Sequence, residues 1–326
     1  MKKLLTIALV ALLAISSCTK SDKLADVTND ETPQITQRNC GAMEVLAQQI
    51  AADPTLEKRM NAIEQFTQRY AATVESGRGN TLVGGVITIP VVVNVVYNTA
   101  AQNISDAQIQ SQIDVLNEDY NNTNADRTKV PSAFSGVDAT VGIRFTLAGI
   151  NRKQSNKKSW STNDAVKKSS QGGIDPTDPA HNLNMWVCNL GQSLLGYAQF
   201  PGGNPATDGV VILYSAFGRT GTLINTYNKG RTATHEVGHW MNLRHIWGDA
   251  TCGNDMVDDT PVAQTSNYGC PNYPKVSSCG TDGHAEMTMN YMDYTDDACM
   301  YMFTNGQKSR ILATFAAGGP RAAIAQ

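Results

Sequence analysis

The most informative stretch of the chain is residues 235–245, which read HEVGHWMNLRH. On a helix, side chains four positions apart lie on one face, so His235 and His239 can bind a single ion. The helix must end before His245, because only a reversal of the chain brings that third imidazole back to the same ion. Asn242 stands where this reversal is expected, and asparagine is, after glycine, the residue that best tolerates a left-handed backbone. Three neutral imidazoles leave the fourth position of a tetrahedral zinc ion for water, as in catalytic zinc sites.

Glu236 follows the first of these histidines directly and is placed to act as a general base and acid. Zinc lowers the pKa of its water, and a neighbouring carboxylate can take the proton and pass it to a leaving amine. Three of the five histidines of the chain lie in this motif, a coincidence expected on the order of once in ten thousand such chains. A zinc-binding surface lipoprotein, an adhesin or binding module without turnover, is the alternative, but it has no need of Glu236.

Composition narrows the class of protein further. The 326 residues are 41% hydrophobic and 17% charged, which suits one or two globular domains. A net charge of -3 without a long basic run gives no reason to expect nucleic acid as a partner. We expect a monomer that acts on protein or peptide substrates.

The N-terminus resembles an export signal. Residues 1–17 hold two lysines, an apolar run too short to span a bilayer, and small residues before Cys18. This pattern is similar to the bacterial lipobox, in which the cysteine is lipidated and becomes the new N-terminus. The alternative is a plain secretory signal with an incidental cysteine. We predict an exported protein that is attached to the envelope or cell surface through a lipid on Cys18, which would be its one contact with a membrane.

The rest of the chain divides into three parts: residues 18–79, 80–245 and 246–326. The first is a polar tether followed by a helical segment over 42–75, in which Pro54 fits the start of a second helix. The second alternates strands and helices, and the third is rich in turn formers and cysteine. We expect strands at 86–96, 142–147, 183–190, 196–200 and 209–214. We expect helices at 105–119, 232–241 and 304–317, the first and last opened by capping boxes and the last closed by Gly318. Pro90 weakens the first strand, because proline favours edges and bulges.

The zinc motif is similar to the extended signature of the metzincin metallopeptidases. Two further stretches resemble the ulilysin-like branch of the pappalysin family. One is RTAT at 231–234 leading into His235, with Trp240 inside the motif; the other is NYMDY at 290–294, followed by CM at 299–300 and FTNGQ at 303–307. The resemblance covers roughly residues 83–317. Asn242 is a departure, since the family pattern has glycine there.

The resemblance implies an α/β (α+β) metzincin-like fold. This fold has a twisted, mixed five-stranded sheet with a backing helix and an active-site helix, followed by an irregular, disulfide-bearing C-terminal subdomain. It implies that Met292 forms the floor of the Met-turn under the zinc ligands. It also implies that Tyr294 stabilises the oxyanion of the tetrahedral intermediate, against the alternative of a purely structural tyrosine. The strand at 196–200 is expected to be the edge that binds an extended peptide.

The resemblance also implies the disulfides Cys252–Cys279 and Cys270–Cys299, and a structural calcium ion. Calcium takes six to eight oxygen ligands, and the candidates form a dense oxygen cluster in one loop: Asp255, Asp258, Asp259 and Thr260. A solvated acidic loop without an ion is the alternative.

Cys40 precedes the catalytic part and is a candidate for latency. In the family, a propeptide cysteine caps the zinc in place of water, and a thiolate is a strong zinc ligand. The alternative is a disulfide between Cys40 and Cys188. Under the first interpretation residues 18–79 contain a propeptide, and cleavage near Arg78 frees the metal and releases the enzyme from its anchor. The resemblance further implies a preference for a basic residue just after the cut. His181 and His284 receive no role.

Overall fold

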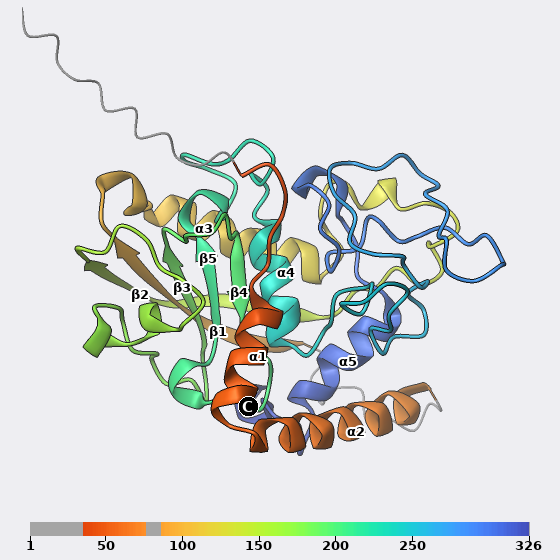
Figure 1. The fold of residues 1–326 in the computed structure, drawn as a ribbon, viewed down its shortest axis with the longest axis horizontal. Coiled ribbons are helices and arrows are strands. Elements are labelled where there is room, and N and C mark those ends of the chain that lie inside the picture. The colour runs from red at the N-terminus through yellow and green to blue at the C-terminus, as the bar shows by residue number, and fades with distance from the viewer. Residues whose placement is uncertain (1–34, 76–85, 326) are drawn as a thin grey trace, which may run out of the picture. The chain divides into compact units, whose positions relative to one another are not determined.

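The computed structural model describes residues 35–75 and 86–325, which belong to one compact unit. The predictions for the signal peptide 1–17, for Cys18 and for cleavage near Arg78 lie outside the described residues. Figure 1 shows a sheet on one side of the active-site helix and irregular chain on the other.

A mixed five-stranded sheet forms the frame, with the strand order β2-β1-β3-β5-β4. Four strands are parallel, and β4 runs antiparallel to β5 at one edge. This confirms the predicted fold class and makes the strand expected to bind peptide an edge strand. The strands are β1 (Ile87–Tyr97), β2 (Ile143–Gln154), β3 (Leu183–Cys188), β4 (Gly196–Ala198) and β5 (Val210–Leu213).

Two features of the sheet differ from expectation. Pro90 lies inside β1, where it pairs with β2 only. Pairing of β1 with β3 begins at Val91, so the N–H that proline lacks is not needed for the ladder with β3. The register of β1 against β2 shifts between Val91 and Val92. The strand β2 also runs seven residues beyond its predicted end at Leu147, because its second half is polar edge strand without an apolar run.

Helices α3 (Asp106–Tyr120) and α4 (Arg231–Trp240) pack against this frame (Figure 1). Helix α3 contacts β2, α4 contacts β4 and β5, and the two helices contact each other. The Ser105 side chain accepts a hydrogen bond from the Gln108 backbone N–H and so caps α3. Helix α4 is buried along its whole length, which fits a helix that carries a site between two layers.

Helix α5 (Asn305–Phe315) begins with a full capping box between Thr304 and Gln307, as predicted. It ends earlier than expected: its C-cap is Ala316, and Gly318 (φ 86°) lies two residues further on. The N-terminal helices are α1 (Ala42–Ala52) and α2 (Thr55–Glu75), separated at Pro54 as predicted. Helix α1 packs on β4 and α2 packs along α5.

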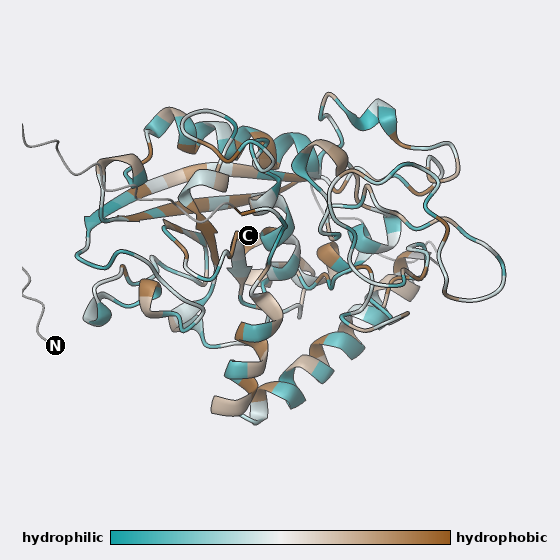
Figure 2. Ribbon diagram, turned by 45° about the horizontal axis from the view of Figure 1, so that its top comes forward, coloured by the Kyte–Doolittle hydropathy of each residue, from teal (hydrophilic) through white to brown (hydrophobic). Residues whose placement is uncertain are grey.

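The core lies between the sheet and the helices, and the strands are largely hydrophobic in Figure 2. Residues 246–303 carry few regular elements, as predicted for the C-terminal subdomain. Short 3-10 turns lie at Ala100–Gln102, Arg127–Lys129, Ala165–Lys167, Ser169–Gln171, Pro205–Thr207, Tyr214–Ala216, Asp297–Cys299 and Ala322–Ala325. None of the helices within residues 35–75 and 86–325 is long and apolar enough to cross a membrane.

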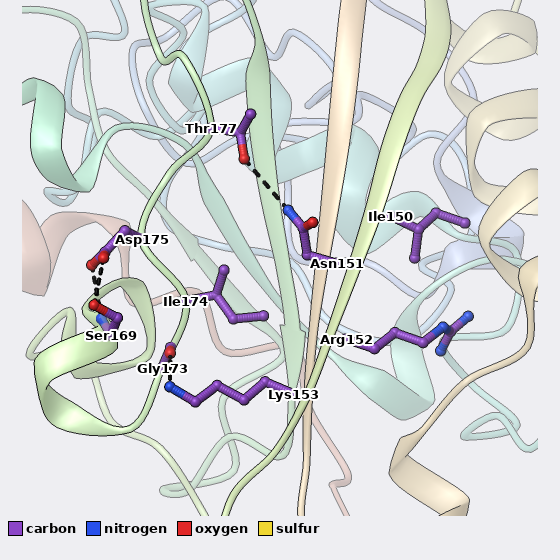
Figure 3. A pocket seen from close by; sticks show the side chains of 9 residues that line it. All are labelled: Ile150, Asn151, Arg152, Lys153, Ser169, Gly173, Ile174, Asp175 and Thr177. Carbon is purple, nitrogen blue, oxygen red and sulfur yellow. Dashed lines mark hydrogen bonds between the residues drawn. The ribbon is translucent and has the colours of Figure 1, made fainter.

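A cavity of about 570 Å³ opens at the β2 edge, between β2 and residues 169–177 (Figure 3). The Lys153 ammonium donates to the Gly173 carbonyl (2.8 Å), and the Asn151 amide donates to the Thr177 hydroxyl (3.4 Å). In the strand order this edge is the one opposite β4. The cavity is therefore separate from β4, the strand that is expected to bind peptide.

Candidate metal centre

Helix α4 presents His235, Glu236 and His239 from one buried segment. Position 238 is closely packed: a Cβ there would lie 2.5 Å from the Met292 sulfur, so a larger residue would displace Met292. Met292 is fully buried, which places it against the helix turn between the two histidines, as the Met-turn interpretation requires.

The chain reverses directly after α4. Asn242 has φ 71°, which confirms the left-handed conformation expected of it. The Leu243 N–H donates to the Gly238 carbonyl (2.9 Å) and closes the turn. The reversal brings His245 back to the two helical histidines.

The Nε2 atoms of the three histidines converge. The distances are 3.1 Å between His235 and His239, 3.0 Å between His239 and His245, and 3.3 Å between His235 and His245. The Cys40 sulfur joins them, and the four ligand atoms all lie within 4.8 Å of one another. It is the one group of three or more His, Cys, Asp or Glu side chains this close among the residues that the structure describes.

Each imidazole is oriented through its other nitrogen. His235 Nδ1 lies 2.7 Å from the Tyr291 carbonyl, His239 Nδ1 lies 2.8 Å from the Leu243 carbonyl, and His245 Nδ1 lies 2.5 Å from Asp249 Oδ1. Since an acceptor oxygen requires the Nδ1 proton, all three Nε2 lone pairs face a common point. Three lone pairs 3.0–3.3 Å apart repel one another unless a cation lies between them, so this donor set fits zinc.

Burial reinforces this arrangement. Burial and the neighbouring imidazoles lower the pKa of His235 well below its usual value, and burial with His245 lowers the pKa of His239 to about 3. Both rings are therefore neutral at physiological pH, the form that binds metal.

Cys40 borders the metal centre directly. Its thiol donates to Glu236 Oε2 (3.3 Å), and the Gly41 N–H donates to the carbonyl of Gly196 on β4 (2.9 Å). Burial and the Glu236 charge raise the pKa of the Cys40 thiol, and a divalent cation at the centre would act in the opposite direction. Burial also raises the pKa of Glu236 to about 8. Cys40 and Cys188 are both free, so the alternative disulfide between them does not form.

Tyr294 borders the same space. Its hydroxyl donates to the Cys40 carbonyl (3.4 Å), and its ring packs against those of His235 and His245. Burial raises its pKa well above the usual value, as do Cys40 and Glu236, so the phenol keeps the proton that it donates.

The side chain of Arg38, two residues before Cys40, lies in a closed pocket that no local sequence pattern predicted. Its guanidinium donates to Asp297 Oδ1 (2.6 Å), the Thr295 carbonyl (3.2 Å) and the Thr232 hydroxyl (3.2 Å). The side chain is 1% exposed and lies 5.1 Å from the centre of the Tyr227 ring. The pocket therefore binds a cationic side chain through charge, hydrogen bonds and an aromatic face.

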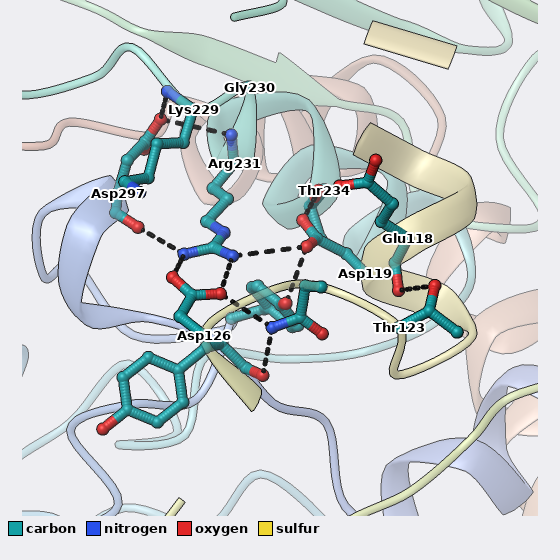
Figure 4. Close-up of polar contacts among 12 residues, drawn as sticks. Glu118, Asp119, Thr123, Asp126, Lys229, Gly230, Arg231, Thr234 and Asp297 are labelled. Carbon is teal, nitrogen blue, oxygen red and sulfur yellow. Dashed lines mark hydrogen bonds and ion pairs between the residues drawn. The ribbon is translucent and has the colours of Figure 1, made fainter. Parts of the chain in front are cut away.

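Asp297 is itself held by hydrogen bonds from the start of α4 (Figure 4). Its Oδ2 accepts from the backbone N–H groups of Lys229 (2.8 Å) and Arg231 (3.2 Å), at the start of α4. The Arg231 guanidinium donates to the Asp297 carbonyl (2.7 Å) and to both oxygens of Asp126 (2.6 and 2.7 Å). Asp119 lies 3.5 Å from the same guanidinium. The carboxylate of Asp297 is thus fixed with one oxygen facing the pocket.

The predicted calcium cluster comes together only in part. The Thr260 hydroxyl lies 2.8–3.0 Å from both oxygens of Asp255 and 2.8 Å from the Val257 carbonyl. Asp258 is exposed, and Asp259 Oδ2 accepts from the Gly306 N–H (2.8 Å). The three carboxylates therefore do not converge, and the candidate ligands reduce to Asp255, Val257 and Thr260. Burial raises the pKa of Asp255 to about 7.

The remaining predicted residues are four cysteines and two histidines outside the metal centre. The structure forms the disulfides Cys252–Cys279 and Cys270–Cys299, the pairs that the resemblance implied. His181 pairs with Asp178 and His284 with Asp282, both away from the metal centre. Asp249 and Trp247, whose ring stacks on His245 at 4.3 Å, were not predicted, because no spacing rule covers the residues after the third histidine.

Comparisons with known proteins agree with this geometry. Residues 178–316 match the model of the peptidase family M43, pregnancy-associated plasma protein-A. An extracellular metalloprotease of Arthroderma otae is 33% identical over 257 residues, which cover 76% of this chain and 84% of that protein. An extracellular metalloprotease of Pyricularia oryzae is 33% identical over 266 residues, which cover 78% and 84%.

Two solved structures are similar as well. Mature mirolysin of Tannerella forsythia, in complex with a cleaved peptide, is 49% identical with a TM-score of 0.71, over 74% of this chain and 96% of that one. A promirolysin mutant of the same organism is 44% identical with a TM-score of 0.80, over 88% and 97%. Sequence, fold and a three-histidine centre beside a glutamate agree, and the chain belongs to the pappalysin (pregnancy-associated plasma protein-A) family of metalloendopeptidases.

Proposed function

We propose that this chain is the latent precursor of an exported zinc endopeptidase that uses Glu236 as general base and acid. The observation that carries the proposal is the convergence of three Nε2 atoms beside the Glu236 carboxylate. Zinc, when bound by His235, His239 and His245, supplies a Lewis acid and lowers the pKa of a water molecule toward neutrality.

The chain's own residues carry the remaining steps. Glu236 takes one proton from the attacking water and later gives it to the leaving amine nitrogen. Tyr294 donates to a backbone carbonyl in the precursor, that of Cys40. In the enzyme the same hydroxyl would donate to the oxyanion that develops on the substrate carbonyl. The edge strand β4 supplies the backbone groups that align an extended peptide.

The direction of the substrate follows from the Arg38 pocket. The precursor segment pairs parallel to β4 at Cys40 and Gly196, with Arg38 reaching the pocket before Cys40 reaches the centre. In a substrate, the bond to be cut lies at the metal centre and the residue after it would fill the Arg38 pocket. From its N- to its C-terminus the substrate therefore reaches the metal centre before the pocket, the reverse of the precursor, and it runs antiparallel to β4. The precursor segment therefore lies along β4 in the direction opposite to that of a substrate. Its peptide bonds at the metal centre have the wrong chain direction for cleavage.

The first test compares the chain from Thr19 onward with its Glu236→Ala variant, following intact mass over time in the presence of zinc and calcium. We expect the unaltered chain to shorten to a product that begins near Arg78, while the variant stays whole. If neither chain shortens, limited trypsin treatment followed by a casein assay decides. Absence of chelator-sensitive casein cleavage after trypsin would leave only the binding-module alternative.

We propose that Cys40 maintains latency and that residues 18–79 contain the propeptide. The support is the position of its sulfur beside the three nitrogens, where a thiolate would take the fourth zinc position. Cys40→Ser is expected to speed the appearance of the shortened product, and an unchanged rate would argue against a cysteine-based block.

We propose that the enzyme prefers arginine or lysine after the cut, because Asp297 faces a pocket that holds the Arg38 guanidinium. In the mature enzyme, Asp297→Asn is expected to lower kcat/KM for arginine at that position by about 100-fold, as for loss of a buried charge-assisted contact. Asp258→Asn, at an exposed carboxylate outside the pocket, is the control. An arginine preference that survives Asp297→Asn would contradict the assignment.

Two finer proposals concern the anchor and calcium. Because Cys18 precedes the propeptide, cleavage near Arg78 would release the enzyme from a lipid anchor; mature enzyme that stays with membranes when Cys18 is replaced would contradict this.

Calcium would lie among Asp255, Thr260 and the Val257 carbonyl. There the single proton of the Thr260 hydroxyl faces three acceptor oxygens. A melting temperature unchanged by calcium would argue against an ion there.

A further inference from the structure

We propose that α2 anchors the propeptide to the enzyme independently of Cys40. The segment would then stay bound after the chain is cut between α2 and β1, and a second step would have to remove it. The inference rests on the proposed function only in taking residues 18–79 to contain the propeptide.

One face of α2 packs against the rest of the chain. Leu56, Met60, Ile63 and Thr67 recur at helical spacing on its inner side, and Leu56 and Thr67 are almost fully buried. The fit is close: a Cβ on Gly202 would lie 3.0 Å from Ile63 Cδ1. Thus α2 packs against the loop after β4 as well as along α5.

A buried ion pair fixes the middle of this face. Arg310 of α5 donates to both oxygens of Glu64 at 2.8 and 2.7 Å, and the two side chains are 4% and 16% exposed. The same guanidinium donates to the carbonyls of Asn242 (3.3 Å) and Met256 (3.2 Å). Removing Glu64 would leave a buried guanidinium without its carboxylate, which is strongly unfavourable.

The anchor also reaches the turn that positions the third histidine. The Asn242 amide donates to the Thr67 hydroxyl (3.3 Å). Yet none of these contacts involves Cys40 or a metal-binding histidine. The N-terminal segment is therefore attached in two separate regions: Arg38, Cys40 and α1 near the metal centre and β4, and α2 on α5. Because one segment carries both, each raises the effective concentration of the other.

The test uses the full chain from Thr19 with Glu236→Ala, which cannot process itself, and a site-specific protease sequence in place of residues 76–80. After complete cleavage, size-exclusion chromatography at micromolar concentration shows whether the N-terminal fragment co-elutes with the remainder. We expect co-elution both with Cys40 and with Cys40→Ser. In the Cys40→Ser background, Glu64→Ala is expected to raise the dissociation constant at least about 100-fold, roughly 2.7 kcal/mol.

Glu57→Ala is the matched control, because Glu57 is an exposed glutamate of the same helix, and it is expected to leave the dissociation constant unchanged. Loss of the fragment from the cleaved Cys40→Ser chain would overturn the proposal, since Cys40 would then be the sole anchor. Equal release by Glu57→Ala and Glu64→Ala would overturn the role of the ion pair.

Two further measurements keep the test interpretable. Melting temperatures of the uncut variants detect misfolding, and Glu64→Gln replaces Glu64→Ala if the latter fails to fold. The binding measurement needs no catalysis, so a failure of the proposed protease function, seen in a casein assay on the active chain, is recorded separately.

Discussion

At the scale of single residues, the third histidine is the one whose position depends on side chains. His235 and His239 stand on a helix and bond backbone carbonyls, whereas His245 follows a turn and bonds the Asp249 carboxylate. The Trp247 ring stacks on the His245 ring and holds it nearly parallel to its own plane (7°). Asp249 and Trp247 together replace the rigidity that the helix gives the other two ligands.

Asp249→Asn is therefore expected to weaken zinc binding by about 10- to 100-fold, the usual loss when a hydrogen-bond partner of a ligand is removed. Competition with a chromogenic chelator measures the zinc affinity of the mature protein directly. Asp258→Asn, at an exposed carboxylate nearby in sequence, is the control and is expected to bind zinc unchanged. Equal affinities of the Asp249→Asn variant and the parent would show that Trp247 and the backbone suffice.

At the scale of elements, the contact between β4 and α4 sets the shape of the cleft. A Cβ on Gly196 would lie 2.8 Å from Glu236 Cγ and 2.9 Å from the Val211 carbonyl. Strand β4 can thus approach Glu236 this closely only because residue 196 has no side chain.

Gly196→Ala is expected to displace Glu236 and lower kcat at least tenfold, and to destabilise the fold by about 1–3 kcal/mol, as overpacking does. Peptide hydrolysis and urea unfolding measure the two effects. Gly149→Ala in β2 is the matched control, because a Cβ there meets nothing within 4 Å. A fully active Gly196→Ala enzyme would mean that β4 moves freely relative to α4.

The elements also show what sequence patterns can and cannot predict. The histidine motif, the Asn242 turn and the cap at Thr304 depend on residues close together in sequence, and each was predicted. The second half of β2 was missed because its exposed edge carries no alternating apolar pattern. Edge strands of this kind are specified by their neighbours, not by their own residues.

At the scale of the whole molecule, the missed parts of the site are long-range pairs. Arg38 and Asp297 are 259 positions apart in sequence, and Glu64 and Arg310 are 246 apart. Local patterns cannot predict such pairs, because a single sequence does not say which surfaces will meet. Both pairs join the N-terminal segment to the rest of the chain, so local patterns miss chiefly how that segment is attached.

Acid should loosen that assembly through Glu64. Burial raises the pKa of this carboxyl, but hydrogen bonds and the charge of Arg310, with a contribution from Arg244, lower it below 4.5 overall. A carboxyl whose pKa is lower in the folded state stabilises that state above its unfolded pKa and loses this effect as pH falls through the folded value. The docking of α2 is thus expected to be strongest at neutral pH and to weaken below about pH 4.5.

Hydrogen exchange of the α2 amides in the uncut Glu236→Ala, Cys40→Ser chain, measured at neutral pH and at about pH 4, reads this out. The Cys40→Ser background removes any contribution from thiol and metal binding. Glu64→Gln has no charge to lose, so its protection should be weaker at neutral pH and should change less with acid. If both chains lost protection in parallel, the acid response would arise elsewhere, and the Glu64–Arg310 pair would not be the element that couples pH to release of the propeptide.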